Sequence, residues 1–135
     1  MSFSTHGVRP FICERLQSAR LTNMARLRIV TWNCGMALAR KAPSLLALKP
    51  DIAVVQECSK QAVDVLSSHG LSGLWFGINP NKGLAVFCRK GFALQAVGKP
   101  FGKWVVPVRV SGEVDFNVLA VWALSFAKTR SRMAH

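Results

Sequence analysis

The stretch that decides the fold is LRIVTWN at Leu27–Asn33, followed at a helix-length interval by IAVVQE at Ile52–Glu57. Both are rich in β-branched residues, which favour strands. Between them, Pro43 predicts the first turn of a short helix that runs through Leu48, and Lys49-Pro50-Asp51 ends it, because proline cannot continue a helix. Strand, crossover and strand form a βαβ unit, so the two strands are expected to be parallel neighbours.

The pattern changes further along the chain. A second helix is expected from about Ser59 to Ser68, with Ser59 as its N-cap and Gly70 closing it. Short apolar stretches separated by turn sequences then predict a β-meander. Its strands are expected at residues 74–77, 84–88, 92–97, 104–110 and 115–123. A βαβα start that passes into a meander predicts an α/β layered sandwich.

The ends of the chain lack this periodicity. Residues 1–26 are expected to be an unstructured basic extension, either a transit peptide or, the preferred interpretation, a stretch of no structural role before a start at Met24. Residues 27–123 form the expected domain. Residues 124–135 are expected to be an irregular basic tail, because strand alternation stops there.

Composition limits the functional classes. The 135 residues suit one domain, and there is no run of 18 apolar residues that would form a transmembrane segment. The net charge of +12 suggests nucleic acid or another polyanion as partner, although half of this excess lies in residues 1–27 and 124–135. The four cysteines show neither zinc nor secreted-disulfide spacing, and no signal peptide is seen, so a cytoplasmic location is expected.

Asn33 and Glu57 are the candidate site residues, since each stands at the C-terminal end of an expected strand. The C-terminal ends of parallel strands meet at one edge, where open α/β sheets bind ligands. An amide and a carboxylate suit a hard divalent cation and a phosphate oxygen. The alternatives are structural: Asn33 could satisfy a backbone group, and Glu57 could interact with the dipole of the next helix.

Other polar and aromatic residues have a structural interpretation first. Cys34 and Cys58 read as small buried hydrophobes, His69 as a helix-end residue, and Lys82 as a solvated turn lysine that could also touch a phosphate. The tryptophans fall on strands, so core packing is expected; a base-stacking platform would need them exposed along a basic groove. They are Trp32, Trp75, Trp104 and Trp122.

Three motifs favour the interpretation of Asn33 and Glu57 as site residues over the structural alternatives. TWN at Thr31–Asn33, KPDI at Lys49–Ile52 and QE at Gln56–Glu57 resemble the endonuclease/exonuclease/phosphatase superfamily, with its deoxyribonuclease-I-like fold, in order and spacing. Residues 79–86 and Phe116–Val121 resemble its next strands less specifically. The resemblance covers residues 27 to about 123. It implies a two-sheet α/β sandwich that hydrolyses a phosphate ester with a metal-activated water.

Carried over to this chain, the resemblance makes Glu57 a metal ligand and makes Asn33 a residue that positions the metal-bound water or a phosphate oxygen. Both would then be catalytic. The implied ion is Mg²⁺ or Mn²⁺, and the implied partner is a phosphate-ester substrate, nucleic acid among the possibilities. The activity would be that of a divalent-metal-dependent hydrolase of nuclease or phosphatase type.

The departures from the family pattern concern its second half. The family supplies an Asp-x-Asn pair and a terminal Asp-His pair there, yet no aspartate follows Asp115 and the only later histidine is His135. Trp122 stands where many members carry a histidine. We therefore expect the N-terminal portion of a two-sheet α/β sandwich, incomplete and inactive alone, that self-associates or needs a C-terminal partner fragment.

Two other interpretations stay open. The chain could be a non-catalytic basic module that binds nucleic acid through arginine and lysine. It could also be a degenerate product, cut short by a frameshift after Val121-Trp122-Ala123, which is compatible with the hydrolase interpretation.

Overall fold

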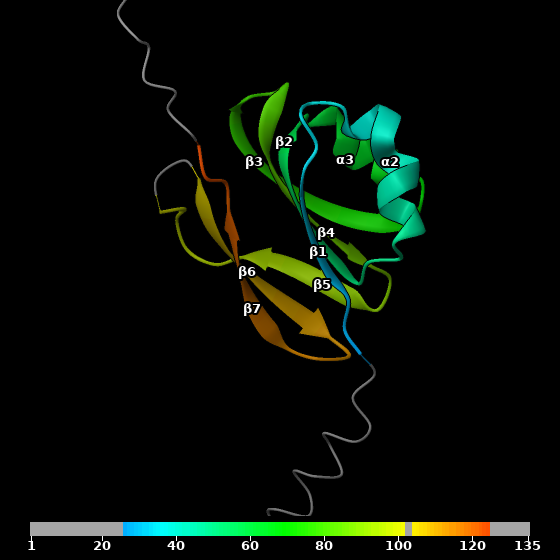
Figure 1. Cartoon of the computed structure of the whole chain (residues 1–135). Coiled ribbons are helices and arrows are strands. Elements are labelled where there is room, and N and C mark those ends of the chain that lie inside the picture. The colour runs from blue at the N-terminus through cyan, green and yellow to red at the C-terminus, as the bar shows by residue number, and fades with distance from the viewer. Residues whose placement is uncertain (1–25, 102–103, 125–135) are drawn as a thin grey trace, which may run out of the picture.

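The computed structural model describes residues 26–101 and 104–124. Within them, seven strands and two helices follow one another along the chain, as Figure 1 traces by colour. They are β1 (Ile29–Asn33), α2 (Leu38–Ala47), β2 (Ile52–Cys58), α3 (Gln61–Ser67), β3 (Leu71–Asn79), β4 (Lys82–Arg89), β5 (Phe92–Ala96), β6 (Val105–Gly112) and β7 (Phe116–Val121).

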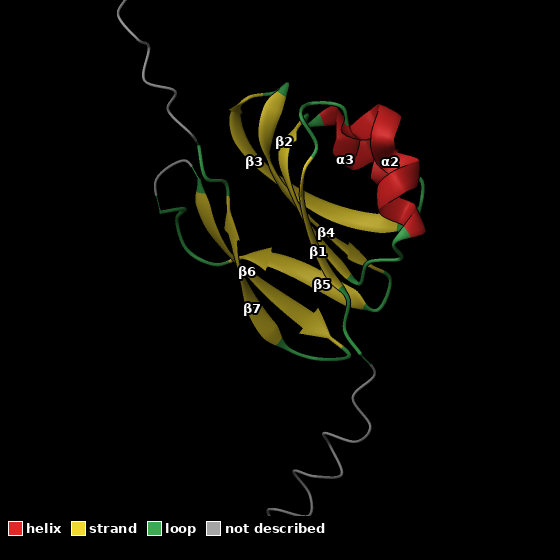
Figure 2. Ribbon diagram, viewed as in Figure 1, coloured by secondary structure: helices red, strands yellow, loops and turns green. Residues whose placement is uncertain are grey.

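The strands form two sheets. One has the order β1-β2-β4-β3 and the other β5-β6-β7. β1 pairs with β2 in parallel, while every other described strand pair is antiparallel, so the expected βαβ unit and meander are both confirmed. Figure 2 shows the two helices together on the four-stranded sheet, with the three-stranded sheet packed apart from them. The result is the expected α/β sandwich.

Two hydrophobic cores hold the layers together, one on each face of the four-stranded sheet. Ala53 and Val55 of β2 pack with the helices, whereas Ile52 and Val54 pack against the three-stranded sheet. This alternation follows from the two-residue period of a strand. It also explains why β2 and β4 are nearly continuous apolar runs, because both faces of each strand are covered.

The first helix begins earlier than the sequence interpretation has it. α2 starts at Leu38, and Pro43 lies inside it rather than in its first turn. Leu38, Ala42 and Leu45 occupy one buried face, so their packing stabilises the helix through the proline. Pro43 itself is exposed, and its ring faces solvent instead of the core. The helix ends where expected, since Lys49 adopts a positive φ of 48° directly before Pro50.

The second helix is shorter than expected and its cap differs. α3 has Lys60 as its N-cap and makes no side-chain capping hydrogen bond, so the prediction of a Ser59 cap is wrong. Ser59 contributes its backbone carbonyl instead, which accepts from Ala62 N at 3.1 Å. Gly70 follows with a φ of 86°, a conformation that glycine adopts readily, and turns the chain into β3 as expected.

Long-range pairing sets the strand ends. β3 is longer than the expected 74–77 because it pairs with β4 from Leu71↔Arg89 to Asn79↔Lys82, across residues with weak strand preference. β7 ends at Val121, two residues short of the expected 123. The expected extension at 1–26 and tail at 124–135 fall outside the described residues, apart from Arg26 and Leu124. Neither described helix has the length and apolar character needed to cross a membrane.

Candidate functional site

The parallel pairing of β1 and β2 brings the two candidate residues to one edge of the sheet. Asn33 is in register with Gln56, so Glu57 follows one residue beyond. Past the strand end the same alignment continues, because Cys34 N donates to Gln56 O at 3.0 Å and Met36 N donates to Glu57 O at 2.8 Å. The predicted neighbourhood of the two strand ends is therefore confirmed.

Glu57 stands at a local irregularity of β2. Its φ is +55°, and the pairing with β4 shifts register between Gln56 and Cys58, which is the signature of a β-bulge. A non-glycine residue in the left-handed region costs about 1–3 kcal/mol and persists only when its surroundings hold it. Here Met36 N and Cys34 Sγ both donate to the Glu57 carbonyl, the latter at 3.2 Å. Bulges of this kind re-aim a side chain, and the Glu57 side chain is 23% exposed.

Lys82 is a site neighbour that sequence reasoning undervalued. Its Nζ lies 3.9 Å from Glu57 Oε1 and 5.4 Å from the ring centroid of Trp122. It begins β4, which runs antiparallel to β2 and places Gly83 opposite Cys58. Lys82 is thus the first residue of a strand rather than a turn residue, and its exposed side chain lies near Glu57, a neighbourhood that only the strand register could have shown.

Asn33 uses its side chain locally. Its Oδ1 accepts from Gly35 N at 3.1 Å and closes the turn that leads away from β1. This is the backbone-satisfying role that the sequence left open as an alternative. The amide is exposed at the same strand edge as Glu57, so the two roles are compatible.

Gln56 joins three strands beneath this edge, and sequence reasoning gave it no such role. Its Nε2 donates to Thr31 Oγ1 at 3.0 Å on β1 and to Val121 O at 3.1 Å on β7. The second bond links the two sheets directly. It thereby fixes Trp122, the next residue after Val121, beside Lys82.

Behind Glu57, the chain is held by a tryptophan and two thiols. Trp75 Nε1 donates to Cys58 O at 2.9 Å. Cys34 and Cys58 are both buried in the helix-side core, as expected of small hydrophobes. Their mutual hydrogen bond lowers the pKa of Cys34, while the same bond and burial raise the pKa of Cys58. These contacts are structural supports for the bulge.

The donor set at the edge suits a hard divalent ion. Glu57 offers a carboxylate and Asn33 an amide oxygen, and Mg²⁺ typically takes one or two carboxylates while keeping several waters. Within residues 26–101 and 104–124, no group of three or more His, Cys, Asp or Glu side chains gathers that could enclose a metal. The edge thus fits part of an open metal site.

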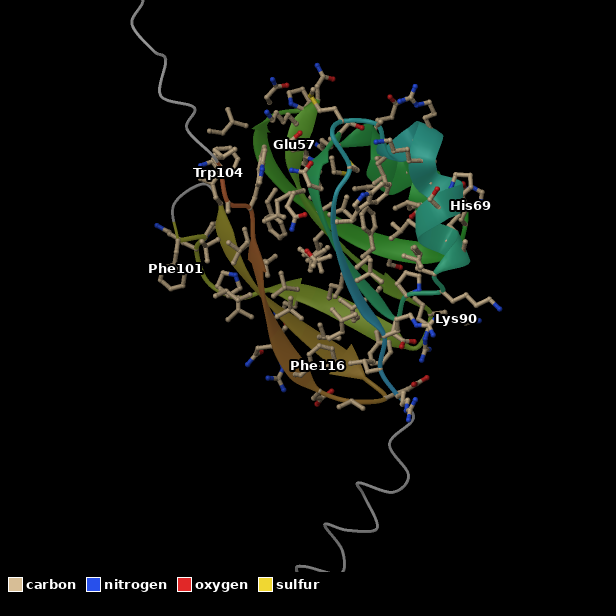
Figure 3. All side chains as sticks on the ribbon, in the orientation of Figure 1. Glu57, His69, Lys90, Phe101, Trp104 and Phe116 are labelled. Carbon is tan, nitrogen blue, oxygen red and sulfur yellow. The ribbon has the colours of Figure 1, made fainter. Side chains whose placement is uncertain are left out.

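Figure 3 relates this edge to the rest of the molecule. Glu57 and Trp104 lie toward the same end, whereas Phe116 lies at the opposite end and His69 on the side of the helices. His69 follows α3 rather than lying in its last turn. Of the tryptophans, Trp122 is buried, and the others are partly buried.

Comparison with known proteins identifies the architecture. No family model and no curated protein matches the chain. Among solved structures, the endonuclease domain of TRAS1, a telomere-specific non-LTR retrotransposon, superposes with a TM-score of 0.56 at 13% identity, over 73% of this chain and 46% of that one. Truncated TDP2 of Caenorhabditis elegans superposes with a TM-score of 0.50 at 17% identity, over 67% and 43%.

The chain therefore spans less than half the length of either structure. At these identities the likeness establishes the fold alone. It agrees with the resemblance carried by the TWN, KPDI and QE motifs and with the two-sheet arrangement. The described residues therefore share the fold of part of these two structures, a two-sheet α/β sandwich of deoxyribonuclease-I-like type.

Proposed function

We propose that this chain supplies the Glu57 half of a divalent-metal-dependent phosphoester hydrolase site of nuclease type. The observation that carries the proposal is the geometry of Glu57. Glu57 stands at a β-bulge at the C-terminal end of β2, next to the end of the parallel strand β1 where Asn33 lies, and its carboxylate is 3.9 Å from Lys82 Nζ. Both structures that superpose on the chain are longer than it, and one of them is an endonuclease domain.

Each residue has a distinct role in this proposal. Glu57 holds Mg²⁺ or Mn²⁺ through its carboxylate, and Asn33 orients a water or a phosphoryl oxygen with its exposed amide. Lys82 Nζ is too far from Glu57 Oε1, at 3.9 Å, for a good charged hydrogen bond, so it can turn toward a phosphoryl oxygen. When bound, the ion would neutralise charge on the phosphoryl oxygens and lower the pKa of a water.

Metal binding can be measured without any turnover. The free Mn²⁺ signal in electron paramagnetic resonance should fall as the chain is added. Glu57→Gln, which keeps the side-chain shape, should weaken Mn²⁺ binding at least tenfold. Asp64→Asn is the matched control, because Asp64 is an exposed carboxylate on α3 in the helix layer. Equal binding by the wild type and Glu57→Gln would overturn the assignment.

A hydrolysis assay is the second test of the proposed function. In the family that the sequence resembles, an Asp-His pair supplies the general base, but these 135 residues hold no aspartate beyond Asp115. The chain by itself should therefore show no Mg²⁺-dependent hydrolysis of DNA or of a generic phosphodiester. Robust turnover that Glu57→Ala abolishes would show that this chain is sufficient. Salt-sensitive DNA binding that ignores both Mn²⁺ and Glu57→Gln would instead support a non-catalytic basic module.

A further inference from the structure

A pocket of about 300 Å³ opens beside Lys82, where the β3–β4 turn meets the ends of β6 and β7. Its lining combines apolar side chains, an amide, a cation and two indoles. The lining residues are Ile78, Asn79, Lys82, Trp104, Trp122 and Leu124. This volume is at the lower end of small-molecule sites, so it suits a single compact ligand unit.

The two indoles form a wall of the pocket. The ring centroids of Trp104 and Trp122 lie 4.3 Å apart at an interplanar angle of 79°, an edge-to-face pair. Trp122 N also donates to Trp104 O at 2.8 Å, which ties the two backbones together. Trp122 is only 2% exposed, whereas Trp104 is partly open. The two rings therefore stand together before any ligand arrives, and a ligand reaches the buried Trp122 Nε1 only when the Trp122 ring turns toward the pocket.

One donor at the pocket has no acceptor in the part of the chain that the structure describes. Trp122 Nε1 is buried and has no hydrogen-bond partner among the described residues, and it is the one side-chain nitrogen or oxygen there in that state. Buried N–H groups in folded proteins are nearly always paired, so this donor is poised for an acceptor. Lys82 Nζ lies over the same ring at 5.4 Å. A cation and an unpaired donor at one place select an anionic oxygen.

The apolar lining argues against a bare anion. Ile78 is 78% exposed on β3, and Leu124 and Trp104 add further apolar surface around the pocket. Inorganic phosphate would leave this surface in water, while a purely apolar ligand would leave Lys82 and the Trp122 N–H without acceptors. A planar ring that carries a phosphate satisfies both parts, since aromatic stacking and a nearby cation are how proteins hold unpaired nucleotides.

We propose that this pocket binds one unpaired nucleotide of a nucleic-acid substrate, with its base against Trp104 and its phosphate oxygens accepting from Trp122 Nε1 and Lys82 Nζ. The inference rests on the proposed function for its biological meaning, because Lys82 connects the pocket to Glu57. It names the substrate class of that site as single-stranded or locally unpaired nucleic acid.

The test uses the full chain, without divalent metal, and follows the indole N–H resonances by ¹H–¹⁵N NMR. The probe is deoxythymidine monophosphate, compared with deoxythymidine and inorganic phosphate. The Trp122 indole resonance should shift most, since its N–H gains an acceptor, and the Trp104 resonance should follow. The nucleotide should bind at least tenfold more tightly than either fragment.

Matched variants locate the site. Lys82→Gln and Trp104→Leu should each lower the affinity for the nucleotide about tenfold. Lys41→Gln is the control, because Lys41 Nζ lies 5.8 Å over the Trp32 ring in an equivalent pair elsewhere. Absence of a Trp122 shift, equal effects of Lys82→Gln and Lys41→Gln, or phosphate binding as tight as nucleotide binding would each overturn the inference. Because neither metal nor hydrolysis is involved, these outcomes are separate from the Mn²⁺ test of Glu57.

Discussion

Gly83→Ala should destabilise the fold strongly, because the Trp75 indole occupies the space that a side chain would need. A Cβ at position 83 would meet Cε2 and Cζ2 of Trp75 at 2.5 Å and Nε1 at 2.6 Å, distances that real Cβ atoms do not tolerate. Gly83 does not have a positive φ, so the penalty comes from contact and not from backbone conformation. The ring, not the glycine, must move.

The size of the destabilisation follows from the packing and the hydrogen bond that the Trp75 ring loses. Overpacking a well-packed interior costs about 1–3 kcal/mol. Displacing the indole also breaks the 2.9 Å hydrogen bond from Trp75 Nε1 to Cys58 O, worth about 0.5–1.5 kcal/mol. A combined loss of about 2–4 kcal/mol should lower the Tm by about 10 °C or more in a domain of this size. Since Cys58 directly follows Glu57, the bulge that aims the carboxylate should loosen as well.

A double-mutant cycle followed by thermal and urea unfolding tests the cause. In a Trp75→Leu background the space is open, so Gly83→Ala should cost less than in the wild type by most of the overpacking penalty. Gly98→Ala is the control: its φ is +69° and nothing lies within 4 Å of its Cβ position, so only backbone strain acts. A cost of Gly83→Ala that is the same in both backgrounds would refute the reasoning.

Two further outcomes are expected. Asp51 accepts a hydrogen bond from Arg28 N at 2.6 Å and forms an ion pair with Arg89. The hydrogen bond from Arg28 is the main cause that lowers the pKa of Asp51, and Arg89 adds to it. The stability that the Asp51 carboxylate adds should therefore be present above about pH 4 and be lost as the pH falls below that value. Asp51→Asn should lower the free energy of unfolding by about 1–2 kcal/mol at neutral pH. In urea unfolding at a series of pH values, the variant should also lose less stability than the wild type as the pH falls. An equal loss in both proteins would exclude this carboxylate as the cause. Leu119 and Val121 are 59% and 43% exposed on β7, and among the described strands β7 pairs with β6 alone. This apolar edge strand should make the chain self-associate, as measured by size-exclusion chromatography with light scattering. Leu119→Lys should reduce the association. A monomer with a cooperative melt would mean that the incomplete-sandwich interpretation has to be withdrawn.

The local pattern of residues determined the elements and their order. Apolar runs at Ile52–Val55 and Leu84–Cys88 predicted buried strands, and Lys49-Pro50 predicted the end of the first helix. The βαβ spacing was enough to place Asn33 and Glu57 at one sheet edge. Such features depend on nearby residues and on the handedness of a crossover, so a sequence can express them directly.

The tertiary structure decided which distant residues meet at that edge. The antiparallel register of β4 on β2 brings Lys82 to Glu57, and the sheet-to-sheet hydrogen bond of Gln56 brings Trp122 to Lys82. The positive φ of Glu57 and the helical Pro43 were likewise set by packing, against the local preference of both residues. Register and packing depend on free energy summed over many long-range contacts, and no short window of sequence contains that sum.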